Sequence, residues 1–234
     1  MPTEAAVKER PILMCGAMVR QTMAGKKTQT RRIFRLPAWA DFDDHDAEGE
    51  YLPEVCHKKS GCLVEVPCPY GVPGDLLYVK EAAWMWCERQ PNGKTKTGRQ
   101  KWLYVPLRCA PIFYCADGHK PSTSITSPYT GNRWLWRWKA SRFLPRWACR
   151  TVLKVTDVRI ERLQDITETE AMDEGAHTLT IIPAGPKSET GEPPLGASPR
   201  ERFRLLWDEL NKPRGYGWDA NPFVWVVSFK RLES

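Results

Sequence analysis

Apolar and small residues recur every three or four positions near the start of the chain, and this spacing predicts a short helix. The positions that show it are Cys15, Met18, Val19, Thr22 and Met23. Gly25 follows at the place where helices commonly end in a left-handed residue. Beyond it, an extended segment is expected from Ile33 to Leu36.

Two further helices are predicted from capping boxes, in which a hydroxyl residue is followed three positions later by glutamate. The first begins after Thr167, runs for about two turns with Glu174 as its last residue, and stops at Gly175. The second begins after Ser198, with a proline at its first position. Its apolar stripe is expected to pack into the core and consists of Phe203, Leu206, Trp207 and Leu210.

Several segments favour strands because apolar residues alternate or run together between turn signals. Within residues 151–160 the alternation changes phase at Thr156 and Asp157, which predicts a bulge of the kind that closing a small barrel needs. The segment from Phe223 to Phe229 is expected to be buried on both faces. The other expected strands are residues 62–66, 75–80, 102–105 and 112–115.

A tryptophan-rich segment covers residues 133–139. If it is extended, Trp134, Trp136 and Trp138 share one face, and the cations lie on the other. Two interpretations stay open. The tryptophans can stack on bases beside the cations, or they can be buried in the core while the cations stay in water.

The chain is basic, with a formal net charge of +7 and a sequence pI near 9.0, which favours a polyanionic partner. It has eight cysteines and no secretory leader, so free thiols and a cytoplasmic location are expected. No apolar run is long enough to cross a bilayer, so no membrane partner is expected. Buried or loop thiols are favoured over a structural zinc site at Cys56, His57, Cys62 and Cys68, because the close cysteine pairs typical of zinc are missing.

The most specific local pattern lies just after the first helix. Gly25, Lys27, Thr30 and Arg32 fit the pattern G-x-K-x-x-[E/T]-x-R. This pattern resembles the signature loop of the ASCH family, small β-barrel domains related to the PUA RNA-binding fold. The threonine form is similar to bacterial amidohydrolases that remove the acetyl group from N(4)-acetylcytidine, and the overall layout resembles larger ASCH-like proteins of phages and prophages.

The resemblance implies a fold of class α+β, a small closed or partly open mixed β-barrel with a few short helices and long loop insertions. It implies one domain over residues 11–234, with insertions near 37–61, 85–145 and 178–197, after a polar tail at residues 1–10. It also implies a catalytic set with Lys27 as base, Thr30 as nucleophile and Glu174 as the residue that orients groups or moves protons. Residues expected to bind nucleic acid or a nucleoside are Gly25, Lys26, Arg31, Arg32, Trp136 and Trp218. No cofactor and no metal are implied.

Three functions follow from these expectations. The first is hydrolysis of an N-acyl group on a cytidine-type base, which the threonine at position 30 favours. The second is a non-catalytic module that binds RNA or a modified base, and the third is a ribonuclease. Partners are therefore RNA, a nucleotide or a modified nucleoside, and the oligomeric state stays open. The sequence contains no zinc-protease, P-loop, nucleophile-elbow or dinucleotide-binding motif.

Overall fold

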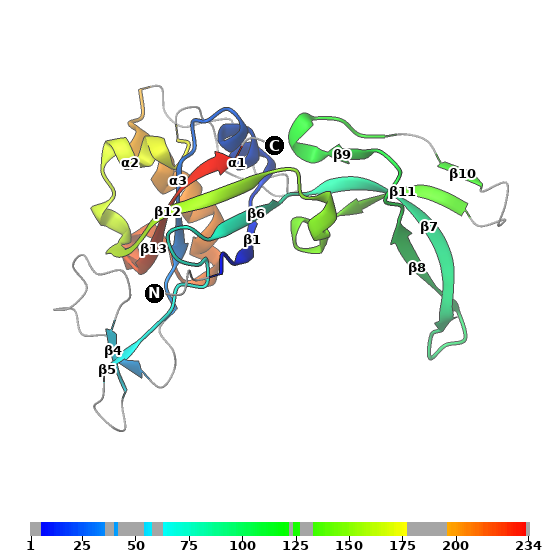
Figure 1. Ribbon diagram of the computed structural model, residues 1–234, viewed down its shortest axis with the longest axis horizontal. Coiled ribbons are helices and arrows are strands. Elements are labelled where there is room, and N and C mark those ends of the chain that lie inside the picture. The colour runs from blue at the N-terminus through cyan, green and yellow to red at the C-terminus, as the bar shows by residue number, and fades with distance from the viewer. Residues whose placement is uncertain are drawn as a thin grey trace. The chain divides into compact units, whose positions relative to one another are not determined.

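The computed structural model describes residues 6–35, 40–41, 54–57, 63–121, 124–126, 133–176 and 196–232, with the backbone only for residues 40–41, 54–57, 63, 124–126 and 133. The strands are β1 (Glu9–Leu13), β2 (Gln29–Ile33), β3 (Ala40–Asp41), β4 (Glu54–His57), β5 (Leu63–Glu65), β6 (Leu76–Lys80), β7 (Ala83–Lys94), β8 (Gln100–Pro106), β9 (Ile112–Tyr114), β10 (Ser124–Thr126), β11 (Arg133–Lys139), β12 (Val152–Arg162) and β13 (Phe223–Leu232). The helices are α1 (Gly16–Met23), α2 (Glu168–Asp173) and α3 (Pro199–Asn211), and short 3-10 turns include η3 (Ser141–Phe143), η4 (Arg146–Ala148) and η7 (Trp218–Ala220). The predicted α+β class with a few short helices is confirmed (Figure 1).

The chain divides into two compact units. Unit 1 comprises Met1–Ile12, Gln21–Tyr78 and Thr151–Ser234, and unit 2 comprises Leu13–Arg20 and Val79–Arg150. The insertion expected near 85–145 lies within unit 2. Glu9 and Arg10, which were expected in a polar tail, already belong to β1.

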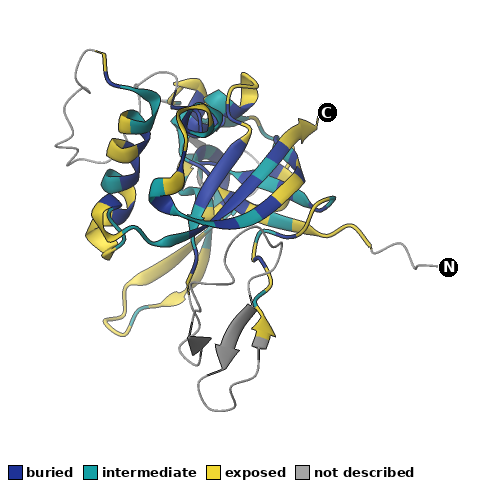
Figure 2. Cartoon of the chain, turned by 90° about the vertical axis from the view of Figure 1, so that its left-hand side faces the viewer, coloured by how far each residue is buried: buried dark blue, intermediate teal, exposed yellow. Residues whose placement is uncertain are grey.

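Unit 1 is built on a five-stranded sheet with the order β1-β6-β12-β13-β2. The long antiparallel pair of β12 and β13 forms its centre, and its register shifts between Val155 and Asp157. This shift confirms the bulge that the change of phase predicted. Figure 2 shows the buried positions gathered along these central strands. A separate three-stranded sheet has the order β3-β4-β5.

The two faces of the β13 strand have different neighbours. On one face, Val224 and Val226 pack into a core cluster with Ala171 of α2 and with Phe203 and Trp207 of α3. Residues opposite each other in a sheet share a face, so Ile33 and Arg31 of β2, the partners of Val224 and Val226, point to this helical side. Thr30, the partner of Val227, points to the other face.

Both capping boxes predicted from the sequence are present. The hydroxyls of Thr167 and Ser198 accept hydrogen bonds from the backbone N–H groups three residues on, and the glutamate side chains return the contact. Gly175 has a φ of +88°, as expected for the residue that stops α2. One expectation for α3 is wrong: Leu210 is 43% exposed, because the buried stripe continues through Asn211 instead.

Unit 2 is built on a sheet with the order β10-β11-β7-β8, and β9 pairs with β7. Its core contains Ala83, Met85, Cys87, Leu144 and Ala148. β7 and β8 form a hairpin, and their pairing extends to Lys94 and Gln100. In the parts of the chain that the structure describes, no helix is long and apolar enough to cross a membrane.

Candidate functional site

The signature loop links α1 to β2 and is anchored at both ends. Gly25 has a φ of +71°, which a residue with a side chain rarely adopts, so the turn after α1 favours glycine here. The carbonyl of Gln21 accepts the backbone N–H groups of Lys26 and Lys27 at 2.9 and 3.2 Å. The N–H of Thr28 donates to the carbonyl of Asp173 at 2.8 Å, which ties the loop to the end of α2.

Lys27 and Glu174 form a buried ion pair, although 147 residues separate them along the chain. The Nζ of Lys27 lies 2.6 Å from Oε2 of Glu174 and also donates to the Glu174 carbonyl at 2.8 Å. Their side chains are 2% and 4% exposed. Two hydrogen bonds to one residue fix the position of the ammonium group, and the adjacent carboxylate favours its charged form.

Gly175 lets the end of α2 approach the loop this closely. A Cβ atom at this position would lie 3.2 Å from the Cβ of Gln21 and 3.4 Å from the Cβ of Lys27. The residue therefore serves two purposes: its positive φ ends the helix, and its missing side chain leaves room for the lysine.

The second oxygen of Glu174 is the unusual atom of this pair. Oε1 is buried and has no hydrogen-bond partner. Nη1 of Arg31 lies 3.9 Å from it, which is beyond hydrogen-bonding distance. A carboxylate that served only to hold the fold together would be expected to use both oxygens, because a buried acceptor without a donor costs free energy.

Arg31 is the centre of a cluster of carboxylates. Its fully buried guanidinium contacts Glu161 at 2.9 Å and Glu170 at 3.1 Å, and it donates to Oε1 of Gln29 at 2.7 Å. Arg159 pairs with the same two glutamates from the other side. Burial raises the pKa of Glu170, but the N–H of Thr167 and the charges of Arg31 and Arg159 outweigh burial and hold that pKa below its ordinary value.

Thr30 is buried within β2, next to Arg31 but on the opposite face of the sheet. The structure therefore joins Lys27, Glu174 and Arg31, and it turns the Thr30 side chain to the face that Val227 shares. The strand lies earlier than expected: an extended segment was predicted from Ile33 to Leu36, whereas β2 spans Gln29–Ile33. Hydrogen bonds to β13 hold this polar segment in an extended conformation. The carboxylates near Arg31 balance its buried positive charge.

The residues expected to bind nucleic acid have different environments. Gly25 and Lys26 are exposed in the loop, and Arg32 is half-buried on β2. Trp218 is only 7% exposed and packs edge-on against Phe203 in the core, so its ring offers no open face to a base. Trp136 belongs to unit 2, where it packs against Trp86 and Phe113 with ring centroids 4.7 and 4.9 Å away.

Sequence reasoning missed the role of Arg159 and Glu161 and treated Glu170 as a helix cap only. One signal was present: Glu170 and Glu174 are four residues apart on one helix, where like charges repel unless cations lie nearby. Arg31 and Lys27 are those cations. The spacing of Arg159 and Glu161, two residues apart on one strand, also places them on the same face.

No group of three or more potential metal ligands occurs among the residues whose side chains are described. Of the four residues considered for zinc, Cys68 is a buried free thiol, and the side chains of Cys56, His57 and Cys62 lie outside the described set.

Comparison of the chain with family models, with curated proteins and with solved structures gave no match. The resemblance to the ASCH family thus stays a prediction from the signature loop.

Proposed function

We propose that this protein is an ASCH-like hydrolase that removes an N-acyl group from a cytidine-type base, with Glu174 and Lys27 as its catalytic residues. The proposal includes the closed or partly open barrel that the resemblance implies, a nucleoside or RNA substrate, and a cytoplasmic location. It requires no cofactor.

The observation that carries the proposal is the unpartnered Oε1 of Glu174, buried beside two cations. A carboxylate oxygen in this state can accept a proton from a water molecule. The developing hydroxide attacks the acyl carbon of the substrate, the tetrahedral intermediate carries a negative charge on oxygen, and the base leaves as a free amine when the C–N bond breaks. Glu174 returns its proton to that amine.

The role of Lys27 in this proposal differs from the one that the resemblance implies. Because its ammonium is held between a carboxylate and a carbonyl oxygen, Lys27 suits stabilisation of a negative oxygen better than removal of a proton. In the same way, a water molecule replaces Thr30 as nucleophile, since the Thr30 side chain points to the face opposite Arg31. Thr30 then contributes to packing within the sheet.

The pair is deeply buried, which favours a small substrate or a single base turned out of its strand over a continuous duplex. In this proposal the substrate enters past Gly25 and Lys26, the exposed loop residues that precede Lys27.

The test is an assay of the full-length protein with N(4)-acetylcytidine, in which released cytidine and acetate are measured by chromatography. The substitution Glu174→Gln removes the proton acceptor, and Glu161→Gln is the matched control, because Glu161 also pairs with Arg31 but lies on β12 and not at the end of α2. Turnover by the wild type and the control, with loss in Glu174→Gln, supports the proposal. Cleavage of unmodified RNA, or binding of acetylated RNA without turnover, would replace it with a ribonuclease or a reader of modified bases.

A further inference from the structure

The positive charge of the chain is concentrated in unit 2. The residues of this unit include fifteen lysines and arginines but only three acids, a formal excess of +12, whereas the whole chain carries +7. Unit 1 therefore has a formal charge of −5. A polyanion would therefore be attracted more strongly to unit 2 than to unit 1.

The three acids of unit 2 are already engaged. Arg150 contacts Glu81 at 2.9 Å and Asp117 at 2.7 Å, so one arginine balances both carboxylates. Glu88 accepts a hydrogen bond from Gln90 at 2.8 Å. The charges of Glu81 and Asp117 are thus balanced mainly by Arg150. The other lysines and arginines of unit 2 keep most of their positive potential.

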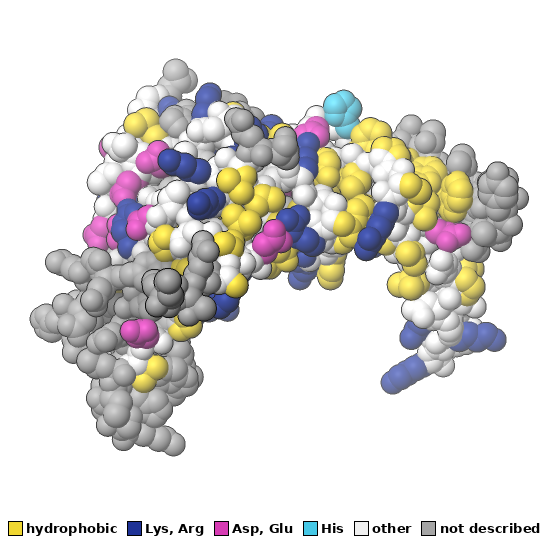
Figure 3. Space-filling model, viewed as in Figure 1, with side chains coloured by type: hydrophobic (Ala, Val, Ile, Leu, Met, Phe, Trp, Pro, Cys, Tyr) yellow, Lys and Arg dark blue, Asp and Glu magenta, His cyan; other side chains and the backbone are white. Residues whose placement is uncertain are grey.

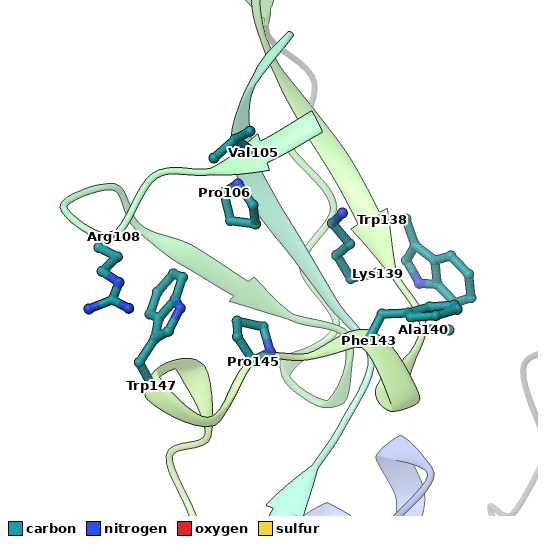
Figure 4. A pocket seen from close by; sticks show the side chains of 9 residues that line it. All are labelled: Val105, Pro106, Arg108, Trp138, Lys139, Ala140, Phe143, Pro145 and Trp147. Atoms are coloured by element: carbon teal, nitrogen blue, oxygen red, sulfur yellow. The ribbon is translucent and has the colours of Figure 1, made fainter. Parts of the chain in front are cut away.

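A groove of about 810 Å³ lies on the surface of unit 2. Aromatic, proline and cationic side chains line it, and no acid is among them; they include Pro106, Arg108, Trp138, Lys139, Phe143 and Trp147. Figure 4 shows Trp147 and Arg108 bordering one end and Trp138 and Phe143 the other. The size is within the range of ligand-binding pockets.

The aromatic rings in this groove are unusually exposed. Trp138 is 54% exposed, Phe143 66% and Trp147 37%, although large aromatic side chains normally bury most of their surface. Arg142 lies 5.5 Å from the ring centroid of Phe143, and Arg108 lies 5.6 Å from that of Trp147. Exposed rings that alternate with guanidinium groups suit a ligand with flat apolar faces and repeated negative charges.

A second group of cations lies on the same unit, at the tip of the β7–β8 hairpin. Lys94, Lys96, Arg99 and Lys101 are all exposed there. Figure 3 shows basic side chains at this tip. They extend the positive surface beyond the groove, as binding of a polymer would require and binding of a single nucleotide would not.

We propose that the groove lined by Trp138, Phe143 and Trp147 binds single-stranded nucleic acid, with bases stacked on the aromatic rings and phosphates held by Arg108, Lys139 and the hairpin cations. A duplex is disfavoured, because paired bases hide the faces that the rings would contact. The formal charge of +12 favours a ligand with many negative charges, such as nucleic acid, over an ordinary protein partner. This inference uses none of the residues assigned to hydrolysis and stands independently of that assignment.

The test measures binding of a fluorescent 12-nucleotide single strand, as DNA and as RNA, to the full-length protein by fluorescence anisotropy at several salt concentrations. We expect binding that weakens with salt and that exceeds binding to a duplex of the same length. Trp138→Ala and Trp147→Ala should each weaken it by about five-fold or more. Leu210→Ala is the control, since Leu210 is an apolar residue of unit 1 that is 43% exposed, and it should change binding by less than about two-fold.

Charge is tested by Arg108→Ala in the groove against Arg231→Ala, an exposed arginine of unit 1. Only the first should reduce affinity and lower the salt dependence. Melting temperatures of all variants show whether the unit stays folded.

Equal binding by the wild type and both tryptophan variants, or equal binding of single strand and duplex, would overturn the proposal. So would a dimer in sedimentation that Trp138→Ala dissociates, because the groove would then hold a second copy of the chain. The rate at which the groove variants deacetylate free N(4)-acetylcytidine is measured as well. This rate tests the proposed hydrolase independently of nucleic-acid binding.

Discussion

The ammonium of Lys27 lies 2.6 Å from Oε2 of Glu174, so a residue of the signature loop and the residue that follows α2 share one buried charge pair. Such a pair is not automatically stabilising, because both charges lose their hydration when they are buried. Replacing only one of the two residues is destabilising, because the other charge then stays buried without its counter-ion.

The first prediction concerns the coupling of these two residues. Lys27→Met should lower the free energy of unfolding by about 3–5 kcal/mol, because Glu174 stays buried without its counter-ion. The double substitution Lys27→Met with Glu174→Met should cost less than Lys27→Met alone. Denaturant unfolding of both single variants and the double variant measures the coupling energy. If the unfolding free-energy changes of the two single variants add up to that of the double variant, the contact has no coupling energy.

The second prediction distinguishes water from Thr30 as the nucleophile. Thr30→Val keeps the branched shape that suits a strand and removes only the hydroxyl. If a water molecule attacks, kcat/KM for N(4)-acetylcytidine should stay within about three-fold of the wild type. A loss of about a hundred-fold or more in a folded Thr30→Val protein would instead assign the attack to the threonine.

The third prediction concerns acid stability. The pKa of Glu170 is below its ordinary value in the folded protein, so its contribution to stability is complete above the unfolded value of about 4.3 and is lost as the pH falls through the folded value. The difference in unfolding free energy between the wild type and Glu170→Gln should therefore be largest near neutral pH and shrink below about pH 4. A difference that is the same at pH 3 and pH 7 would show that the Glu170 charge contributes nothing.

The fourth prediction concerns the cysteines. Burial raises the pKa of the Cys68 thiol to about 11 and raises that of Cys87 as well, whereas Cys109 is exposed. Alkylation of the native protein with iodoacetamide near pH 7.5, followed by peptide mass mapping, should label Cys109 at least about a hundred-fold faster than Cys68. Labelling of Cys68 at the rate seen for Cys109 would mean that the Cys68 environment is open.

Local signals made the helices and the bulge predictable. The capping boxes at Thr167 and Ser198 and the change of phase before Asp157 depend on residues a few positions apart, so the sequence displays them directly. The start of β2 could not be found in this way. Its residues are polar, and its extended form depends on β13 and on glutamates 130 or more positions away.

The candidate site was predictable in part. The resemblance brought Lys27 and Glu174 together, but the buried cluster around Arg31 depends on three elements that the sequence does not show to be neighbours. Alternation also placed the three tryptophans of β11 on one face without giving their burial. Trp136 packs against Trp86 and Phe113, whereas Trp138 is mostly exposed, and this difference depends on which residues of other strands lie beside each ring.

The central claim is that Glu174 accepts a proton through its unpartnered oxygen, and the most direct test is the kcat/KM of Glu174→Gln for N(4)-acetylcytidine beside Glu161→Gln. The claim predicts a loss of about 10²–10⁴-fold in kcat/KM for Glu174→Gln. Because this substitution leaves the buried Lys27 without its counter-ion, Glu174→Gln should also melt below the control, so both variants are assayed at a temperature at which circular dichroism shows them folded. A Glu174→Gln protein with kcat/KM within a few-fold of the control, or a wild type that releases no cytidine at all, would contradict it.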